Sequence, residues 1–374
     1  MKSQAPQVGD RLSLHIDRLA IGGRGVARHE GFVIFVENVA PDEDVRAEIT
    51  QVKKNHAEAK YLEVLTPSPH RVQPICPVFG ICGGCNWQHI DYAEQLKQKH
   101  ELVLNALVKF SGFDASVIHV LGVKPSPKPF HYRNRIQLHF AGTKLGFFKR
   151  LSHDIVDIDS CPITEDEINA QIAATRLKVT GQSLGRIELS TLAAEGAKVD
   201  GRFNQVNTAQ NRNLIATVVE KAREIISTPA PAQIWDLYAG GGNFSFPLIE
   251  NFPQAMITAV ELNSDSVASA RSRLPENLKH QFVESDVERF LSRHRGERPT
   301  LILIDPPRTG CGTEVMKLIS EVRPANIFYV SCHPVTLARD LKVLSAVGYR
   351  LHPVLPFDMF PQTDHVECFV HLSL

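Results

Sequence analysis

Residues 234–244 read Ile-Trp-Asp-Leu-Tyr-Ala-Gly-Gly-Gly-Asn-Phe, an apolar strand that runs directly into a glycine-rich loop. Consecutive glycines permit a tight turn and let a ligand approach the backbone closely. Gly240, Gly241 and Gly242 lack the G-x-G-x-x-G spacing that packs a pyrophosphate against a helix, so no phosphate needs to be held here. Three glycines in a row are also typical of a plain flexible turn, so the loop needs support from its surroundings.

That support comes from the alternation of strands and helices around the loop, which begins near Gln210. We expect apolar strands at 234–238, 256–260, 301–304 and 327–330, and two closing strands at 351–356 and 366–372. This alternation is typical of a doubly wound sheet with helices on both faces. We therefore predict an α/β, Rossmann-like catalytic domain over residues 206–374.

Two acidic residues follow the next strands of this pattern. Glu261 ends the second strand, where a carboxylate can accept both hydroxyls of a ribose, and Asp286 follows the third strand, within reach of an adenine amino group. Both acids are also typical helix N-caps. The ordered set of glycine loop, Glu261 and Asp286 favours S-adenosylmethionine over a dinucleotide, and Asp305 is a plausible electrostatic partner of the sulfonium.

The fourth strand leads into Asp305-Pro306-Pro307-Arg308. Two prolines in a row hold a rigid extended backbone that can present carbonyls to a flipped base. Related Asp-Pro-Pro-Tyr loops serve amino-methylating enzymes, but Arg308 replaces the aromatic residue that would stack on adenine. Pro307 stands where RNA 5-methylcytosine enzymes carry their nucleophile. Both alternative chemistries are therefore weakened.

Cys332 lies just past the fifth strand, at the sheet edge where ligands bind in this architecture. A uracil ring is poorly nucleophilic at C5, and a thiolate added at C6 makes C5 enolate-like, so that it can capture a methyl group. Glu367 is the candidate base that removes the C5 proton. The alternatives are a buried structural thiol at 332 and a surface strand residue at 367. We interpret Cys311 and Cys368 as structural.

The N-terminal part carries short alternating strands at 11–16, 31–36, 44–51 and 60–65, separated by Gly and Pro turns. This spacing is typical of a small closed β-barrel that binds oligonucleotides, which we assign to residues 1–66. Its basic residues would follow phosphates or would simply be solvated at the surface. They are Arg24, Arg28, Lys53, Lys54 and Lys60.

Residues 67–205 are predicted to form a central α+β domain, after a linker at 66–69. Apolar residues at helical spacing predict a helix over 92–110. Strand-like pieces at 133–140, 145–149 and 186–190 and one helix near 165–176 complete this domain. No internal repeat is apparent.

The central domain also holds a cysteine cluster. Cys76, Cys82 and Cys85 form C-x5-C-x2-C, and Cys161 can supply a fourth thiolate. Four thiolates with two glycines among them favour an iron–sulfur cluster, [4Fe–4S], because a structural zinc more often shows two C-x2-C pairs. Unligated thiols are a third alternative. We expect the cluster to be structural, since radical enzymes use C-x3-C-x2-C.

Composition limits the class of protein. The chain has 374 residues, 43% of them hydrophobic, which suffices for two or three domains with proper cores. Lys plus Arg equals Asp plus Glu at 41 each, so RNA contacts must come from local patches. No stretch is apolar enough for a membrane span or a signal peptide. Seven cysteines without an export signal argue against disulfides, and we expect a cytoplasmic protein.

Together these motifs resemble the RNA 5-methyluridine (uracil-C5) methyltransferase family, in the branch with an N-terminal TRAM barrel and a four-cysteine iron–sulfur site. The resemblance covers nearly the whole chain. It rests on residues 22–28, 76–85, 132–135, 203–207, 236–244, 305–310, 331–340 and 365–367.

The resemblance implies that Cys332 is the nucleophile and Glu367 the proton acceptor. It also implies that the cofactor site is lined by Gln205, Tyr238, Asn243, Glu261, Asp286 and Asp305. His333 stands where the family usually has Asn, and Ala239 where Cys is common. Neither departure removes a reacting group, and His333 would change how the base is held.

The expected activity is therefore S-adenosylmethionine-dependent methylation of uridine C5 in structured RNA by a monomeric enzyme, with 23S ribosomal RNA as the expected substrate. The central domain would contribute Arg133, Arg135, Lys149 and Arg150 to the grip on RNA. Alternatives are methylation of uridine 54 in transfer RNA, methylation of cytosine C5 or an exocyclic amine, and a non-enzymatic iron–sulfur RNA-binding protein or redox-responsive chaperone.

Overall fold

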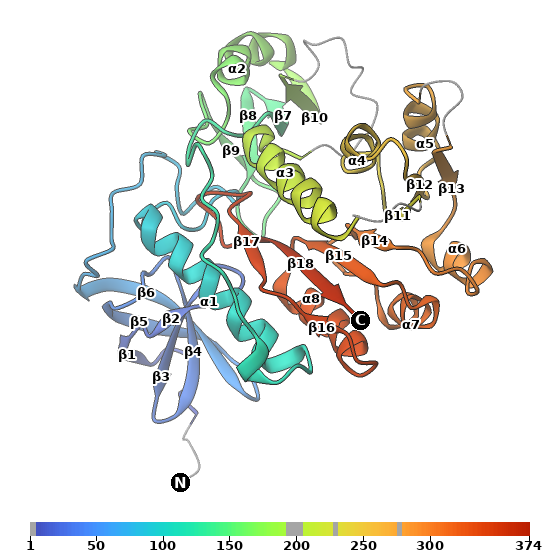
Figure 1. The fold of residues 1–374 in the computed structure, drawn as a ribbon. Coiled ribbons are helices and arrows are strands. Elements are labelled where there is room, and N and C mark those ends of the chain that lie inside the picture. The colour runs from blue at the N-terminus through green and yellow to red at the C-terminus, as the bar shows by residue number, and fades with distance from the viewer. Residues whose placement is uncertain (1–4, 192–204, 227–230, 275–278) are drawn as a thin grey trace. The chain divides into compact units, whose positions relative to one another are not determined.

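The computed structural model describes residues 5–191, 205–226, 231–274 and 279–374 (Figure 1). The described residues form two compact units. The first unit holds those within Met1–Leu102, Lys128–Glu195 and Phe360–His365, and the second holds those within Val103–Pro127, Gly196–Met359 and Val366–Leu374. Both units are therefore discontinuous in sequence. Each of the three predicted domains contains one of three separate sheets.

The first sheet of the first unit has the strand order β1-β5-β6-β4-β3-β2. Its strands are β1 Arg11–His15, β2 Arg18–Leu19, β3 Gly25–His29, β4 Phe32–Glu37, β5 Asp44–Val52 and β6 His56–Thr66. Side chains of β4 alternate between buried and half-buried, as expected for a strand with one face on a core. The backbone N–H of Asp17 donates to Val26 O at 2.9 Å, which links the end of β1 back to β3 and curls the sheet into a barrel.

The sequence did not predict β3, because its first residue belongs to the glycine run interpreted as a turn. Gly25 is required there for space rather than for a turn. A Cβ at this position would lie 2.3 Å from Cγ2 of Val39 and 2.8 Å from Cγ2 of Ile16, both fully buried. The glycine therefore lets the strand pack directly on the barrel core.

The second sheet of the first unit has the order β10-β7-β8-β9. Its strands are β7 Arg135–Gly142, β8 Lys144–Phe148, β9 Ile155–Asp157 and β10 Gln182–Ser190. Helix α2, Asp166–Val179, contacts β7, β8 and β10 and buries Ile168 and Ile172 against them. The predicted strands and the helix of this region are confirmed, and β9 is additional.

The second unit is built on an eight-stranded sheet, whose main path has the order β13-β12-β11-β14-β15-β18-β16, with β17 paired to β18. The strands are β11 Gln233–Leu237, β12 Met256–Glu261, β13 Gln281–Glu284, β14 Leu301–Ile304, β15 Asn326–Ser331, β16 Arg350–Leu351, β17 Leu355–Phe357 and β18 Glu367–Ser373. Strands β11 to β15 pair in parallel, and β18 is antiparallel to β15. The predicted Rossmann-like α/β fold is confirmed.

Helices cover both faces of this sheet (Figure 1). One core contains α6 Val287–Arg293, α7 Thr313–Val322, α8 Pro334–Ser345 and the last turns of α1, which spans Tyr92–Phe110 as predicted. A second core packs α5, Ser264–Arg271, on β12 and β13. Helix α4, Ser245–Asn251, contacts β12 and also α3, Thr208–Ile225. The short 3₁₀ helix η1 is Ala115–Val117.

The single closing strand predicted at 351–356 is instead two short strands, β16 and β17. Pro353 lies between them and has no N–H to donate to a ladder. The neighbouring Val354 N–H donates to His119 O at 2.8 Å, outside the sheet. The proline therefore divides the strand that the apolar pattern predicts as continuous.

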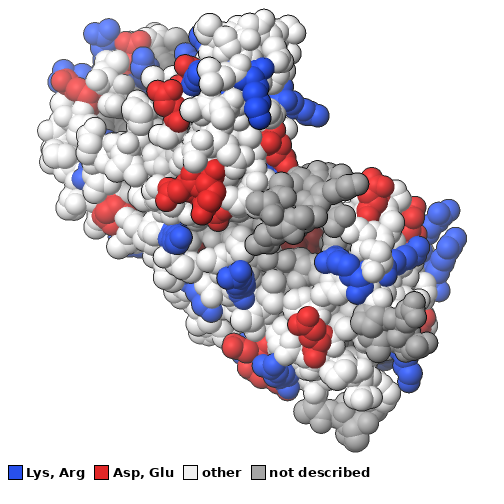
Figure 2. Space-filling view, turned by 90° about the horizontal axis from the view of Figure 1, so that it is seen from above, with Lys and Arg blue, Asp and Glu red and all other residues white. Residues whose placement is uncertain are grey.

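The surface carries both signs of charge. Figure 2 shows basic and acidic side chains interspersed over the face that it presents, without one continuous basic patch. This matches the equal numbers of basic and acidic residues in the chain. Within the described ranges, none of the helices has the length and apolar character needed to cross a membrane.

Candidate active site

The sheet of the second unit reverses its strand order between β11 and β14. At such a switch point the connections of neighbouring strands leave in opposite directions, which opens a crevice at their carboxyl ends. The glycine loop follows β11 here. Tyr238, Gly240 and Gly242 all have positive φ angles, and a Cβ on Gly242 would lie 2.6 Å from the Phe246 ring. The loop therefore needs glycine for its backbone conformation and, at Gly242, for space beside Phe246.

Glu261 holds this loop from the neighbouring strand. Its Oε2 accepts from the Gly240 N–H at 2.9 Å and its Oε1 from the Asn263 N–H at 2.7 Å. Asn263, and not Glu261, caps α5, because its side chain accepts from Ser266 N. The N-cap alternative is thus wrong for Glu261.

Asp286 does act as a helix N-cap. Its side chain accepts from the Arg289 N–H at 3.1 Å at the start of α6. A contact between Asp286 and an adenine ring remains a prediction.

The other proposed cofactor residues lie around the same loop. The amide groups of Asn243 and Asn211 bond each other at 2.8 and 3.2 Å, which ties the loop to α3. Tyr238 is half-buried directly after β11. Gln205 is nearly buried and precedes α3, whereas Phe203 and Asn204 of the same motif lie outside the described residues.

Cys332 lies between the end of β15 and the start of α8. His333 is the N-cap of α8, and its Nδ1 accepts from the Thr336 N–H at 3.3 Å. An Asn at this position would cap the helix through its side-chain oxygen in the same way. The family's usual Asn and this His are therefore interchangeable in their effect on the helix that carries the cysteine.

Glu367 reaches the same place from the C-terminal end of the chain. Strand β18 pairs with β15 so that Cys368 is opposite Ser331, and one further step of this antiparallel register sets Glu367 opposite Cys332. The Glu367 side chain is 2% exposed, and no described residue donates a hydrogen bond to its carboxyl group. A buried carboxyl beside a thiol is thus available for proton transfer.

Two buried acids, Asp236 and Glu367, and the half-buried Asp305 make this edge of the sheet electrostatically unusual. Burial raises the pKa of Asp305 to about 7, and the neighbouring Asp236 adds to the effect. Burial likewise raises the pKa of Asp236 to about 7 and that of Glu367 well above its usual value. A ligand with a positive charge would relieve the repulsion that ionisation of these groups creates.

The same acids also affect the pKa of the Cys332 thiol. Its pKa is raised to about 12, first by burial and then by Glu367 and Asp305, whereas Arg308 acts in the opposite direction. In the protein without ligands the thiol is therefore neutral. Only a thiolate attacks efficiently, so a nucleophilic role of Cys332 would require added positive charge to lower this pKa.

Asp340 supports this site structurally, although the sequence did not single it out beyond its motif. The side chain is 1% exposed and accepts from the Tyr329 hydroxyl at 2.7 Å and from the Cys311 N–H at 2.7 Å. A Cβ on Gly310 would lie 2.5 Å from its Oδ2. One carboxylate thus fastens α8 to β15 and to the loop that follows the Asp-Pro-Pro-Arg motif. The sequence signal that could have identified Asp340 was an acidic residue on the apolar face of a helix.

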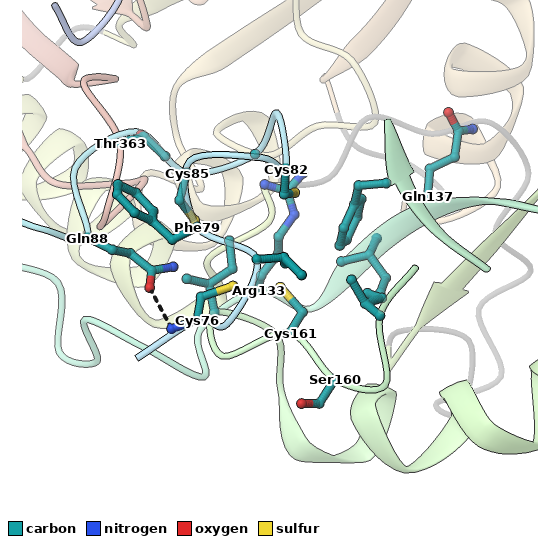
Figure 3. A pocket seen from close by; sticks show the side chains of 16 residues that line it. Cys76, Phe79, Cys82, Cys85, Gln88, Arg133, Gln137, Ser160, Cys161 and Thr363 are labelled. Carbon is teal, nitrogen blue, oxygen red and sulfur yellow. Dashed lines mark hydrogen bonds between the residues drawn. The ribbon is translucent and has the colours of Figure 1, made fainter. Parts of the chain in front are cut away.

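The four clustered cysteines line a separate pocket in the first unit, with a volume of about 220 Å³ (Figure 3). Cys76, Cys82 and Cys85 lie on the loop before α1, and Cys161 precedes α2. Burial raises the pKa of all three loop thiols, that of Cys85 to about 12, and Cys161 raises each further. Among the described residues, no three His, Cys, Asp or Glu side chains are grouped so that they could hold a metal ion.

The strand order, the glycine loop and the acidic edge define a Rossmann-like, S-adenosylmethionine-dependent methyltransferase. The family model of tRNA (uracil-5-)-methyltransferases matches residues 186–374, and that of the TRAM domain matches residues 6–62. The chain belongs to the tRNA (uracil-5-)-methyltransferase family. It is an RNA methyltransferase with an N-terminal TRAM domain, and the non-enzymatic alternative is wrong.

Full-length relatives agree with this assignment. An uncharacterized RNA methyltransferase of Bdellovibrio bacteriovorus is 43% identical over 391 residues, which cover 100% of this chain and 97% of that protein. One from Thermosynechococcus vestitus is 31% identical over 98% of this chain and 99% of its own. The crystal structure of Pyrococcus abyssi tRNA (uracil-54, C5)-methyltransferase with S-adenosyl-L-homocysteine has a TM-score of 0.71, 22% identity, and coverage of 97% and 100%. At that identity it shows the fold.

Replacement of Asp340 by Asn should loosen the attachment of α8. We expect Asp340→Asn to lower the free energy of unfolding by about 1–3 kcal/mol, because the charged acceptor of the buried Tyr329 hydroxyl and the partly buried Cys311 N–H becomes neutral. The turnover number should fall at least threefold while KM for S-adenosylmethionine stays nearly constant. Urea unfolding and steady-state kinetics measure both, with exposed Glu314→Gln as the control. Unchanged stability would contradict the attachment.

The affinity for S-adenosylmethionine should rise with pH. Asp305 is protonated below its pKa of about 7 and ionised above it, and only the ionised form attracts the sulfonium. Titration calorimetry from pH 6 to 8 should show tighter binding and fading proton release. S-adenosylhomocysteine, with a neutral sulfur, serves as the control and should change less than twofold. Parallel pH profiles for the two ligands would refute this role of Asp305.

Proposed function

We propose that the protein methylates C5 of uridine in structured RNA through a covalent intermediate on Cys332. The pairing of Cys332 with Glu367 at the carboxyl edge of the sheet supports this proposal most directly. Asp305 is close enough to raise the pKa of both groups, so the sulfonium partner, the nucleophile and the base belong to one site.

The reaction assigns one step to each group. The thiolate of Cys332 adds to C6 of the flipped uracil, and C5 attacks the methyl carbon, which releases S-adenosylhomocysteine. The Glu367 carboxylate then takes the proton from C5, and the electron pair left behind expels the thiolate from C6. A carboxyl group whose pKa is raised by burial is a stronger base than an exposed one, which suits this step.

We propose 23S ribosomal RNA as the substrate, acted on by a monomer. Support comes from the combination of a TRAM barrel with a four-cysteine pocket, which marks the branch that the sequence resembles. The second candidate is uridine 54 of transfer RNA, because the Pyrococcus abyssi enzyme of similar fold carries that name. Labelled S-adenosylmethionine and total RNA from a strain that lacks the gene distinguish the two. Nucleoside analysis identifies the product, mapping of the label identifies the RNA, and light scattering gives the oligomeric state.

We also propose that the four-cysteine pocket holds a [4Fe–4S] cluster. Each iron of such a cluster takes one cysteine, so the sulfurs surround a cavity, whereas a zinc ion needs all four within bonding distance of one point. Backbone N–H groups of Val78 and Phe79 interact with Cys76 and that of Gly84 with Cys82, as is favourable for cluster thiolates. The cluster would tie the loop before α1 to the segment before α2.

Variants of the two catalytic residues should separate the steps. Glu367→Gln should still form the adduct and transfer the methyl group, but release product about 10²–10⁴-fold more slowly, because the base is lost. The RNA–protein adduct should therefore survive denaturing electrophoresis and carry the label. Cys332→Ala should give neither adduct nor product, and Cys311→Ala, which removes a thiol outside the proposed chemistry, should retain methylation. A fully active Cys332→Ala protein would disprove the mechanism.

Loss of a cysteine from the pocket should remove the cluster. Anaerobically purified protein is expected to show the visible absorbance of a cubane cluster with four iron and four sulfide per chain. Cys161→Ser should lower the iron content severalfold and reduce the melting temperature, while Cys368→Ser should keep the iron. Zinc in stoichiometric amount, or equal iron in both variants, would rule the cluster out.

A further inference from the structure

The loop that joins β17 to β18 leads directly into the proposed base. Strand β17 ends at Phe357 and β18 begins at Glu367, and these two residues pair with each other across the ladder. Within this loop Phe360–His365, the loop tip, belongs to the first unit, whereas Met359 and Val366 belong to the second. The tip is therefore held by elements that lie outside the Rossmann-like sheet.

Buried side chains of the first unit hold the first carbonyls of the loop tip. The Lys99 ammonium donates to Phe360 O at 3.0 Å, and Lys99 is fully buried. The Tyr132 hydroxyl donates to Pro361 O at 3.1 Å. An ammonium taken out of water costs free energy unless it is well bonded, so Lys99 and the tip fix each other in one arrangement.

Gln362 is the strained residue of the loop tip. Its φ is 70°, in a region that residues other than glycine rarely adopt. Its side-chain oxygen and its backbone N–H both bond the Gln95 amide at 3.0 Å, and its carbonyl accepts from the Asn86 N–H at 3.2 Å and the Trp87 N–H at 3.1 Å. Such strain persists only where the surroundings overdetermine it, and it is typical of functional segments.

Asn86 and Asp364 form a reciprocal pair beside Gln362. Asn86 Nδ2 donates to Asp364 Oδ1 at 2.7 Å, and the Asp364 N–H donates to Asn86 Oδ1 at 3.1 Å. Oδ2 of Asp364 accepts from the Gly22 N–H of the barrel at 2.6 Å. A Cβ on Gly23 would collide with the Asn86 side chain, so this turn of the barrel needs glycine for the pair to form.

The pair lies close to the base along the chain. Only His365 and Val366 separate Asp364 from Glu367, and three residues of extended chain span about 10 Å at most. Val366 is 1% exposed and packs in the core of the second unit. So short a connection cannot absorb a displacement of Asp364, and the displacement is passed on to the first residue of β18.

We propose that the Asn86–Asp364 pair positions Glu367 for removal of the C5 proton. Asn86 is a positioning residue, because it acts on the reaction only through the loop tip and Glu367. The proposal rests on the proposed function, in which Glu367 is the base. It predicts that disruption of the pair slows release of the methylated product while methyl transfer itself continues.

A charge swap tests the pair. Asn86→Asp sets two carboxylates against each other. Added Asp364→Asn relieves this, because the new amide group donates across the pair and its oxygen still accepts from the Gly22 N–H. Full-length protein, prepared anaerobically, is followed in a single turnover with labelled S-adenosylmethionine and total RNA from a strain that lacks the gene. After RNase digestion, labelled protein on a denaturing gel reports how fast the methylated adduct forms and decays.

The two rates should separate. We expect Asn86→Asp to slow adduct decay about 10–100-fold and adduct formation less than about threefold, because a displaced base impairs only the later step. The double variant should decay at about the wild-type rate. In a Glu367→Gln background Asn86→Asp should add less than about twofold, because both changes act on one step. Asn251→Asp, the same substitution at an exposed position after the first turns of α4, is the control and should behave as wild type.

Folding is checked by melting temperature and, because Asn86 follows Cys85, by iron content. If Asn86→Asp fails to fold, Asp364→Asn alone tests the pair and should slow decay about 3–10-fold.

The outcomes separate this proposal from the proposed function. Adduct decay at the wild-type rate in Glu367→Gln would overturn the function. Slow decay in Glu367→Gln but normal decay in folded Asn86→Asp or Asp364→Asn would overturn the positioning role. Equal slowing of formation and decay, or a double variant no faster than Asn86→Asp, would overturn it as well.

Discussion

The catalytic arrangement depends on the antiparallel pairing of β15 with β18. This ladder brings Glu367, near the end of the chain, to the residue that follows β15. Side chains alternate along a strand, so a slip of one residue would turn Glu367 to the other face and bring Cys368 to the thiol. The apolar residues of β18 fix the register, because Val370 and Leu372 must fill the core that α8 shares. Packing therefore determines which side chain is available as the proposed base.

The same packing holds carboxyl groups in surroundings that disfavour their ionised form. Asp236, Asp305 and Glu367 all have raised pKa values, so the folded state binds more protons than the unfolded chain between about pH 4 and 7. Their contribution to stability is present below that window and is lost as the pH rises through it. A cationic cofactor that binds beside these carboxyl groups would restore this stability at neutral pH. Repulsion among these carboxyl groups would thus favour a sulfonium over a ligand with a neutral sulfur.

Much of the fold follows from local pattern. The helix over 92–110 and the parallel strands were predictable because their apolar periodicity extends over whole elements. Strand β3 was not predictable, because it depends on how Gly25 packs against the barrel core. The break at Pro353 was not predictable either, because it depends on one missing N–H. Within the site, Cys332 was recognisable from its position after a strand. The role of Asp340 needed the structure, because its partners Tyr329 and Cys311 lie 11 and 29 residues away in sequence.

Recognition of RNA in this protein cannot depend on a strong overall field. The chain has no net charge, and within the first unit the buried Glu43 compensates Arg71. Phe79 lines both the cysteine pocket and a second pocket beside the barrel, which Arg71 and His89 also line, so the loop that carries three of the cysteines forms a wall of each. A cluster that held this loop in place would therefore also stiffen the wall of the second pocket.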